Sequence, residues 1–430
     1  MVNSHKIPAG IYPSLGDAAR VWLKIGILSF GGPAAQIALM HKEVVDEREW
    51  LTEQQFLEAL SFCMLLPGPE AMQLATYAGW RLHGTLGGLI AGLLFIIPGA
   101  MIVMTLAAIY TIYGNLPLIE ALFFGIKSAV LVIVLGALLR VGRKALTQKL
   151  HYVIAILAFT GIFCFSIPYP VIVLLAGLLG CVLGKGQKQR HIVNMADVSL
   201  RKTFGTIVSW LAIWLVPLFA LTWTQSPSLL IELGKFFSSL AVVTFGGAYA
   251  VLAYMAQDVV VQFGWLTAGE MVDALGLAET TPGPLILVTQ FVGFVAGARE
   301  GGLLFGLAAA LVTLWVTFTP CFLWIFAGAP YIEWISSQPR LKGALNSITA
   351  AVVGVILNLS IWFALHVLFT TVRHKEFGIL TFWQPDLATI ELLPLTLFIF
   401  SCFLAFRLHW SIIKILFVTA ISGAALKLVL

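Results

Sequence analysis

Long apolar runs separated by short polar loops dominate the hydropathy pattern of this chain. A membrane-spanning helix needs about 20 mostly apolar residues, and nine uninterrupted stretches meet or approach that length. These stretches are 84–112, 117–139, 150–166, 169–184, 203–223, 300–328, 343–370, 390–406 and 411–429. The pattern predicts an all-α protein that crosses a membrane many times.

Four further apolar segments are interrupted by glycine or proline. The segments 17–40 and 228–256 carry the motif Phe-Gly-Gly, at Phe30, Gly31, Gly32 and at Phe245, Gly246, Gly247. The segments 52–82 and 267–298 carry Pro-Gly-Pro, at Pro67, Gly68, Pro69 and at Pro282, Gly283, Pro284. Proline removes a backbone donor and clashes with the preceding turn, so a helix must end and restart there.

The interruptions belong to an internal repeat with a constant spacing of 215 residues. Residues 30–69 and 245–284 align without a gap and share 16 identities in 40 positions, including Trp-Leu-Thr at 50–52 and 265–267. One deletion extends the match and pairs Gly87-Gly88 with Gly301-Gly302. We interpret this as duplication. The repeats predict an N-terminal half at 1–190, a linker with one extra helix at 191–227, and a C-terminal half at 228–430.

Composition excludes an ordinary soluble domain. Hydrophobic residues make up 60% of the chain, charged residues 10%, and the mean hydropathy is +0.98, whereas soluble domains are about 25% charged. The net charge of +5 lies in loops and predicts no nucleic-acid partner. The five cysteines have no paired spacing, so neither a disulfide framework nor a metal site is expected.

Basic loops predict the orientation. The loops 140–149 and 185–202 are rich in Lys and Arg and should be cytoplasmic. If each interrupted segment crosses once, the chain makes about 13 crossings, and seven of them precede the second half, which is therefore inverted. If the Pro-Gly-Pro segments are re-entrant hairpins instead, the halves are parallel. We favour inverted halves, which are the commoner transporter design.

The broken helices are the first candidate for a substrate site. A half-helix that restarts inside the membrane exposes backbone N–H groups and a positive dipole end, which suit an anion. Gln73, Thr280 and Thr281 add polar groups beside the breaks. The Phe-Gly-Gly motifs have two open interpretations, since they either unwind a helix or let a neighbouring helix pack closely.

Intramembrane charges are the second candidate, because they are costly in lipid. Lys127 lies deep in segment 117–139 and is a candidate anion ligand, with Asn346 at the matching position of the second half. The alternative is that Lys127 pairs with a buried acid. Glu70 and Glu279 flank the two Pro-Gly-Pro motifs and could carry protons or balance charge. Arg81 is either an interfacial anchor or a further anion contact.

Enzymatic function has no support in the sequence. The chain lacks the HExxH, GxSxG, Walker and CxxC motifs. We therefore expect a secondary or passive transporter with no cofactor.

The block FGGPAAQIALMHKEVVDEREWLTEQQFLEALSFCMLLPGPEAMQLATYAGW and its second copy closely resemble the chromate ion transporter family, in its long two-domain form. The resemblance covers essentially the whole chain, and the stretch GIKSAVLVIV looks like a further family segment. One departure is that Ser128 and Ser347 stand where proline is expected after the lysine of the first half.

This resemblance implies inverted halves and export of chromate across the bacterial inner membrane, with resistance to chromate as the result. Sulfate, a similar oxyanion, is the first alternative substrate. An anion channel and a non-transporting membrane sensor or scaffold are the other function classes, and homodimer formation stays open.

Overall fold

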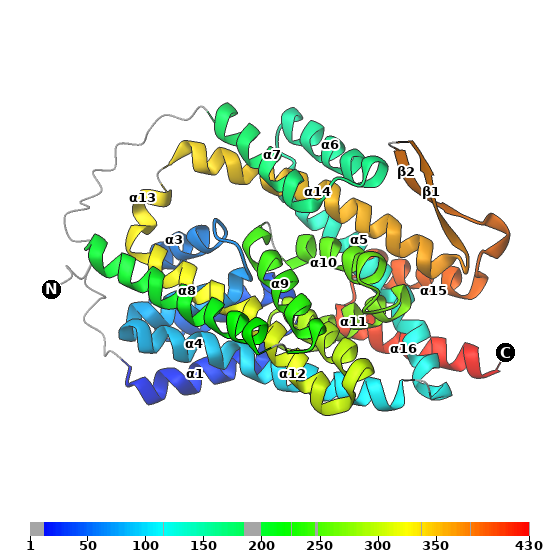
Figure 1. Ribbon diagram of the computed structural model, residues 1–430, viewed down its shortest axis with the longest axis horizontal. Coiled ribbons are helices and arrows are strands. Elements are labelled where there is room, and N and C mark those ends of the chain that lie inside the picture. Colours follow the sequence, from blue (N-terminus) through cyan, green and yellow to red (C-terminus); the bar gives the residue numbers. More distant parts are fainter. Residues whose placement is uncertain are drawn as a thin grey trace. The chain divides into compact units, whose positions relative to one another are not determined.

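The computed structural model describes residues 13–114, 116–184, 199–224, 226–245, 248–336, 338–378 and 380–429 (Figure 1). The described chain is mostly helical, and five helices are long and apolar enough to cross a membrane. These five are Glu70–Tyr113, Pro117–Ala145, Leu200–Trp223, Leu285–Tyr331 and Pro339–Leu368, with shorter apolar helices at Lys149–Phe165, Tyr169–Leu183 and Leu392–Arg407.

Two compact units divide the chain, and each takes segments from both sequence halves. The first comprises Met1–Met104, Gly184–Ala248 and Thr281–Lys342. The second comprises Thr105–Leu183, Tyr249–Thr280 and Gly343–Leu430. These packing units do not test the repeat boundaries, which stay a prediction.

The first unit begins with α1 (Leu15–Leu28), α2 (Gly32–His41) with its π-helical extension Lys42–Asp46, α3 (Glu53–Cys63) and α4 (Glu70–Tyr113). It continues with α8 (Leu200–Trp223), α9 (Ser228–Val243), α12 (Val288–Gly328), which follows the 3₁₀ turn Leu285–Leu287, and α13 (Ile332–Ser336). In α8 only Trp214 is buried, which leaves nearly the whole apolar surface of that helix exposed.

The interrupted segments of the first repeat fold back on themselves. Lys24 of α1 reaches Glu43 at 2.5 Å, although a continuous helix would place them about 28 Å apart. The rings of Phe62 on α3 and Tyr77 on α4 are 6.4 Å apart. Phe-Gly-Gly and Pro-Gly-Pro therefore form the tips of two helical hairpins. The expectation that each interrupted segment crosses once is wrong for this repeat, because its helices have only 10–14 residues before the chain reverses.

Each of α4 and α12 also consists of two antiparallel arms. The backbone leaves helical geometry at His83–Gly84 and at Gly301–Gly302, where Gly84 (φ +63°, ψ −154°) and Gly302 (φ +77°, ψ −175°) adopt conformations open essentially to glycine alone. A Cβ atom at Gly88 would lie 3.0 Å from the carbonyl oxygen of Thr76. The sequence pairing of Gly87-Gly88 with Gly301-Gly302 is therefore corrected, since the turn at Gly302 matches the turn at Gly84.

The repeated Trp-Leu-Thr motif starts the helix that leads to each Pro-Gly-Pro break. The hydroxyl of Thr52 accepts from the N–H of Gln55, whose side chain accepts from the N–H of Thr52. Thr267 and Glu270 form the same reciprocal pair at α11. Such a capping box satisfies two backbone donors at the start of a helix.

The second unit contains α5 (Pro117–Ala145), α6 (Lys149–Phe165), α7 (Tyr169–Leu183), α10 (Ala248–Gln257) with its π-helical extension Asp258–Gln262, and α11 (Ala268–Thr280). It also contains α14 (Pro339–Leu368), α15 (Leu392–Cys402) extended by the π-helix Phe403–Arg407, and α16 (Ile412–Val429). Helix α5 is its centre, packing against α11, α15 and α16.

One element corrects the all-α expectation. The strands β1 (Val372–Phe377) and β2 (Leu380–Pro385) pair antiparallel, from Val372 opposite Pro385 to Phe377 opposite Leu380. Gly378 has a φ of +64° in the connecting turn, as tight hairpins require. The hairpin contacts α6, where the hydroxyls of Ser166 and Thr381 are 2.7 Å apart (Figure 1).

Candidate functional site

Within the first unit, the tips of the two repeats are joined by a reciprocal pair of backbone hydrogen bonds. The N–H of Gly283 donates to the carbonyl oxygen of Ser29 at 2.9 Å, and the N–H of Gly68 donates to that of Thr244 at 2.8 Å. Ser29 and Thr244 differ by 215 positions, as do Gly68 and Gly283. In each repeat the residue just before Phe-Gly-Gly therefore binds the glycine of the Pro-Gly-Pro break of the other repeat.

Glycine is required at these tips for two separate reasons. Gly68 and Gly283 have φ values of +124° and +92°, which disfavour any side chain. Space is also short, because a Cβ atom on Gly68 would lie 2.8 Å from the Sγ of Cys321. On the opposite side, a Cβ atom on Gly99 would clash with the carbonyl oxygen of Pro282.

A small cavity lies where the tips meet. Its lining combines both Pro-Gly-Pro breaks with the start of α2: Pro33, Gln36, Pro69, Glu70, Ala71, Pro284 and Leu285. The cavity volume is about 10 Å³, which is about what one water molecule needs. The cavity as it stands has no room for a tetrahedral oxyanion.

Gln36 is the functional candidate that sequence reasoning missed. Its buried side-chain amide donates to the carbonyl oxygen of Gly283 at 2.6 Å and to that of Ser29 at 3.2 Å. It thereby links the two tips through a side chain, whereas the matching residue of the second repeat is Val251. The available signal was a lone amide within the apolar segment 17–40.

Two more buried amides lie close behind the breaks. Gln73 donates to the carbonyl oxygen of Pro67 at 2.7 Å, and Gln290 donates to that of Ala100 at 3.2 Å. The Oε1 atom of each has no hydrogen-bond partner among the described residues. Gln73 therefore lies at the first break, and Gln290 binds the second arm of α4 through Ala100.

Charge is distributed unequally over the two breaks. Glu70 is half-buried, opens α4 and lines the tip cavity, whereas Leu285 occupies the matching position after the second break. An acid at a helix N-terminus is stabilised by the helix dipole, but it would repel a bound anion. The first break therefore carries a carboxylate directly after Pro-Gly-Pro, and the second has a leucine there.

Lys127 belongs to the second unit, where it is paired with an acid. Its Nζ lies 3.4 Å from the Oδ2 of Asp273, which also accepts a hydrogen bond from the hydroxyl of Tyr110 at 2.9 Å. The Asp273 side chain is 5% exposed and that of Lys127 is 29% exposed. This geometry is the alternative considered for Lys127, and a direct contact with an anion stays a prediction.

Glu279 and the two threonines precede the second break. The hydroxyl of Tyr249 donates to Glu279 at 2.8 Å, and the hydroxyl of Thr280 donates to the carbonyl oxygen of Leu277 at 2.8 Å, within its own helix. Thr281 is buried at the start of the next segment. Glu279 is therefore a buried, hydrogen-bonded acid beside the break.

Several predicted residues are not gathered at the tips. Arg81 is near the far end of its arm, eleven residues from Glu70 or about 17 Å along the helix. Asn346 is exposed on α14 in the second unit. Phe30 does lie at the tip of the α1–α2 hairpin, but its side chain is exposed. Gly246 and Gly247 lie outside the described residues.

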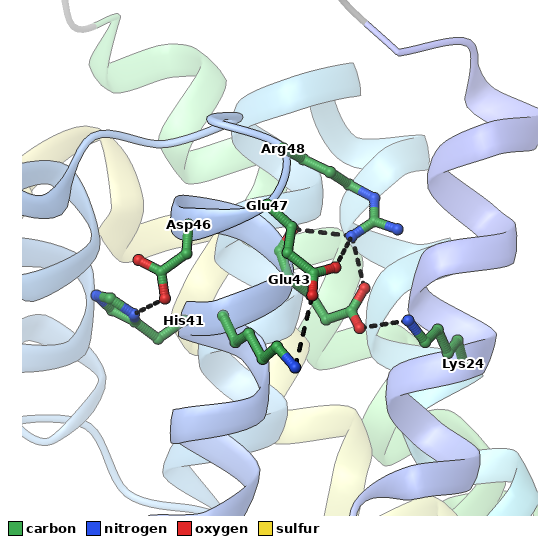
Figure 2. A network of polar contacts seen from close by, with 7 residues as sticks. Lys24, His41, Glu43, Asp46, Glu47 and Arg48 are labelled. Atoms are coloured by element: carbon green, nitrogen blue, oxygen red, sulfur yellow. Dashed lines mark hydrogen bonds and ion pairs between the residues drawn. The ribbon is translucent and has the colours of Figure 1, made fainter.

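A separate charge network holds the base of the α1–α2 hairpin. Figure 2 shows the buried Glu43 between two cations, with Oε1 at 2.5 Å from Lys24 and Oε2 at 2.6 Å from Arg48. Burial by itself raises the pKa of Glu43. The hydrogen bonds and positive charges of Lys24 and Arg48 outweigh that effect and hold the pKa below its ordinary value.

His41 extends this network toward α3. Its Nδ1 lies 3.2 Å from Asp46 and its Nε2 lies 2.5 Å from Glu53. The hydrogen bond with Glu53 raises the pKa of His41 above its ordinary value, against the opposing effect of burial, and Asp46 adds to the rise. Through its contact with Glu53, His41 links the two hairpins of the first repeat.

Comparison with known proteins identifies the family. The chromate transporter profile matches residues 16–181 and 231–426, one segment in each repeat. The chain belongs to the chromate transporter family. A member of this family is a membrane transporter and not an enzyme.

Two curated chromate transporter relatives cover most of this chain. The chromate transport protein of Pseudomonas aeruginosa is 34% identical over 358 residues, which is 81% of this chain and 80% of the relative. A probable chromate transport protein of Synechococcus elongatus is 32% identical over 345 residues, or 80% and 83% of the two chains. An uncharacterised transporter of Methanocaldococcus jannaschii is 27% identical over 357 residues, or 82% and 85%. No solved structure matches the chain.

Proposed function

We propose that this protein is a secondary transporter that exports chromate across the bacterial inner membrane and so confers chromate resistance. The observation that carries the proposal is the reciprocal joint between Phe-Gly-Gly and Pro-Gly-Pro tips, at a small cavity in a chain of the chromate transporter family. Relatives named for chromate transport support the choice of substrate.

The tips offer the chemistry that a divalent oxyanion requires. When the tips separate, the N–H groups of Gly68 and Gly283 lose their carbonyl partners and become free donors. The amide of Gln36 is released in the same step and can donate to an oxyanion oxygen. In this proposal the substrate replaces the contacts between the tips. The tips therefore close when the site is empty and stay separated when the substrate is bound.

The other predicted residues take supporting roles. Phe30, Gly31 and Gly32 shape the tip of the α1–α2 hairpin, and the prolines set where each helix restarts. Gly246 and Gly247 lie outside the described residues, and their part in the substrate site stays a prediction from the sequence. Glu70 and Glu279 balance charge or carry protons, and Lys127 offsets the charge of Asp273.

The folded-back hairpins change the proposed membrane topology. The first repeat places both motifs at the tips of hairpins, and we propose the same arrangement for the second repeat from its sequence match. Nine helical segments then cross: the second arms of α4 and α12 together with α5, α6, α7, α8, α14, α15 and α16. Five of them precede α9, and an odd number inverts the second repeat. The N-terminus and the basic loop 140–149 then lie on the cytoplasmic side.

The decisive experiment measures flux of radiolabelled chromate and sulfate into inside-out membrane vesicles, with and without a pH gradient. Accumulation of chromate inside the vesicles against its own electrochemical gradient supports the proposal. Preference for sulfate would change the substrate, and flux that never exceeds the gradient would indicate an anion channel. A vesicle population that moves neither anion would contradict transport and favour a sensor or scaffold. Homodimer formation is a further expectation, checked by the mass of the purified protein in detergent.

A further inference from the structure

Helix α11 carries two buried acids, and each is served by a tyrosine and by a cation of α5. Asp273 is 3% exposed and Glu279 is 5% exposed. Tyr110 donates to Asp273 at 2.9 Å, and Tyr249 donates to Glu279 at 2.8 Å. Two sites of the same composition therefore follow one helix.

The cations complete the two sites. Lys127 lies 3.4 Å from Asp273, and the guanidinium of Arg140 acts electrostatically on both Tyr249 and Glu279. The helices pack closely, since Gly276 lies directly against Ile126 of α5. The two acids are six residues apart, or about 9 Å along α11.

Each carboxylate has one oxygen left without a partner. Oδ1 of Asp273 and Oε2 of Glu279 have no hydrogen-bond partner among the described residues. Buried polar atoms are nearly always hydrogen-bonded, and a purely structural ion pair is stable only when its remaining lone pairs are satisfied. An unpartnered carboxylate oxygen at a buried site is a place for a proton to bind.

Few other charges face the two acids. Glu270, one turn before Asp273, acts on it through its negative charge. Glu120 acts on Lys127 but is itself paired with Lys427 of α16 at 2.5 Å. Helix α16 also packs on α11, and its charged residues are Lys414 and Lys427.

The positions that match Asp273, Glu279 and Lys127 in the other repeat do not reproduce this arrangement. The position of Asp273 corresponds to Glu58, which lies on a cavity of about 550 Å³ and accepts a hydrogen bond from Gln54 at 2.9 Å. The positions of Glu279 and Lys127 correspond to Met64 and Asn346. Among the described residues, the matching positions of α3 therefore hold no buried acid with a tyrosine donor.

We infer that Asp273 and Glu279 are the proton-carrying groups of the transport cycle. This inference rests on the proposed function and deepens it by naming the coupling residues. In each step an unpartnered carboxylate oxygen takes a proton from water on one side of the membrane and later returns it to water on the other side. Protonation of Asp273 turns its pair with Lys127 from neutral to singly positive, and this change favours binding of an anion.

The test uses the full chain in proteoliposomes with a pH-sensitive dye inside. Wild-type protein should move protons when chromate is added, and it should also exchange chromate for chromate. Asp273→Asn should lose chromate-linked proton movement and keep the exchange reaction. Glu58→Gln, at the matching position of the first repeat, should behave like the wild type, and Asp273→Glu should restore proton movement.

Each other outcome has a definite meaning. Proton movement that persists in both Asp273→Asn and Glu279→Gln would overturn the inference. If Asp273→Asn and Glu279→Gln both lost the chromate exchange reaction and also melted at a lower temperature, the inference would be overturned as well, because the two acids would then be structural. A wild-type protein that moves no chromate or sulfate would remove the proposed function itself, which is a distinct result.

Discussion

The backbone N–H of Gly283 binds the carbonyl oxygen of Ser29 at 2.9 Å, although 254 positions separate these residues. The same bond joins Gly68 to Thr244. Because both partners are backbone atoms, only replacement of the donor glycine by proline would delete either bond directly. The two joints differ in their side chains, since Gln36 reinforces the first and Val251 stands at its position beside the second.

Replacement of Gln36 by Met should weaken the first joint. The variant loses two hydrogen bonds to buried carbonyl oxygens, a change of about 1–3 kcal/mol in unfolding free energy. We expect a lower melting temperature in detergent and a higher KM for chromate. Gln54→Met is the matched control, because Gln54 is exposed and bonds only to Glu58. Equal melting temperatures for both variants would contradict the assigned role of Gln36.

Replacement of Gly99 by Ala should displace the second Pro-Gly-Pro tip. The added methyl group would clash with the carbonyl oxygen of Pro282, a backbone atom that cannot rotate away. Overpacking of this kind costs about 1–3 kcal/mol or more, and we expect chromate flux to be lost.

The control for Gly99 is Gly136→Ala on α5. Its Cβ atom would meet only the Nη1 of Arg140, at 3.6 Å. Alanine favours a helix over glycine by about 1 kcal/mol, so this variant should melt at the same temperature as the wild type or higher. Retained flux in Gly99→Ala would mean that the tip tolerates displacement.

The network around Glu43 predicts acid sensitivity. Its folded-state pKa lies below the ordinary value of about 4.3. The stabilisation is therefore complete above that value and is lost as the pH falls through the folded-state pKa. Melting temperatures measured across this range should fall more steeply for the wild type than for Glu43→Gln. Glu300→Gln, a change at an exposed acid, should keep the wild-type slope.

For His41 we expect the opposite dependence of folding stability on pH. Its folded-state pKa lies above the ordinary value of about 6.5. The link to Glu53 and Asp46 therefore stabilises the fold fully below that value and is lost as the pH rises through the folded-state pKa. His41→Gln should remove this component from the melting profile. His409→Gln, a change at an exposed histidine, should leave it in place.

Nine crossings predict which loops can be labelled from each side. In a background with all five native cysteines replaced, Arg373→Cys should react with an impermeant thiol reagent from outside. Glu47→Cys should react only after the cytoplasmic face is opened. Both positions are exposed. Labelling of Arg373→Cys from the cytoplasm alone would exclude inverted repeats.

The sequence predicted the positions of the breaks and the apolar segments 84–112, 117–139, 203–223, 300–328 and 343–370, which lie in helices long enough to cross a membrane. It could not predict that the chain reverses at Phe-Gly-Gly, because segment 17–40 is equally apolar whether it continues or folds back. The link from Gln36 to Gly283 was hidden for another reason. Its partner is a backbone carbonyl 247 positions away, and a backbone carbonyl leaves no signature in the residue type.

The pair of Lys127 and Asp273 shows a similar limit. Both residues were visible as polar positions, but 146 residues separate them, and only the packing of α11 on α5 brings them together. Spacing along the chain also gave the wrong pairing of glycines at the turns of α4 and α12, where Gly87-Gly88 were matched with Gly301-Gly302. Gly84 lies 15 residues after Pro69, whereas Gly302 lies 18 after Pro284, so a gapless register drifts beyond the breaks.

The tip cavity has room for about one water molecule, and this size bears on the leakage of protons and ions across the membrane. A continuous thread of water would conduct protons and small ions, and it would short-circuit the membrane potential. A single isolated water cannot form such a thread. We therefore expect the proposed transporter to leak few protons or small ions while its tips are closed.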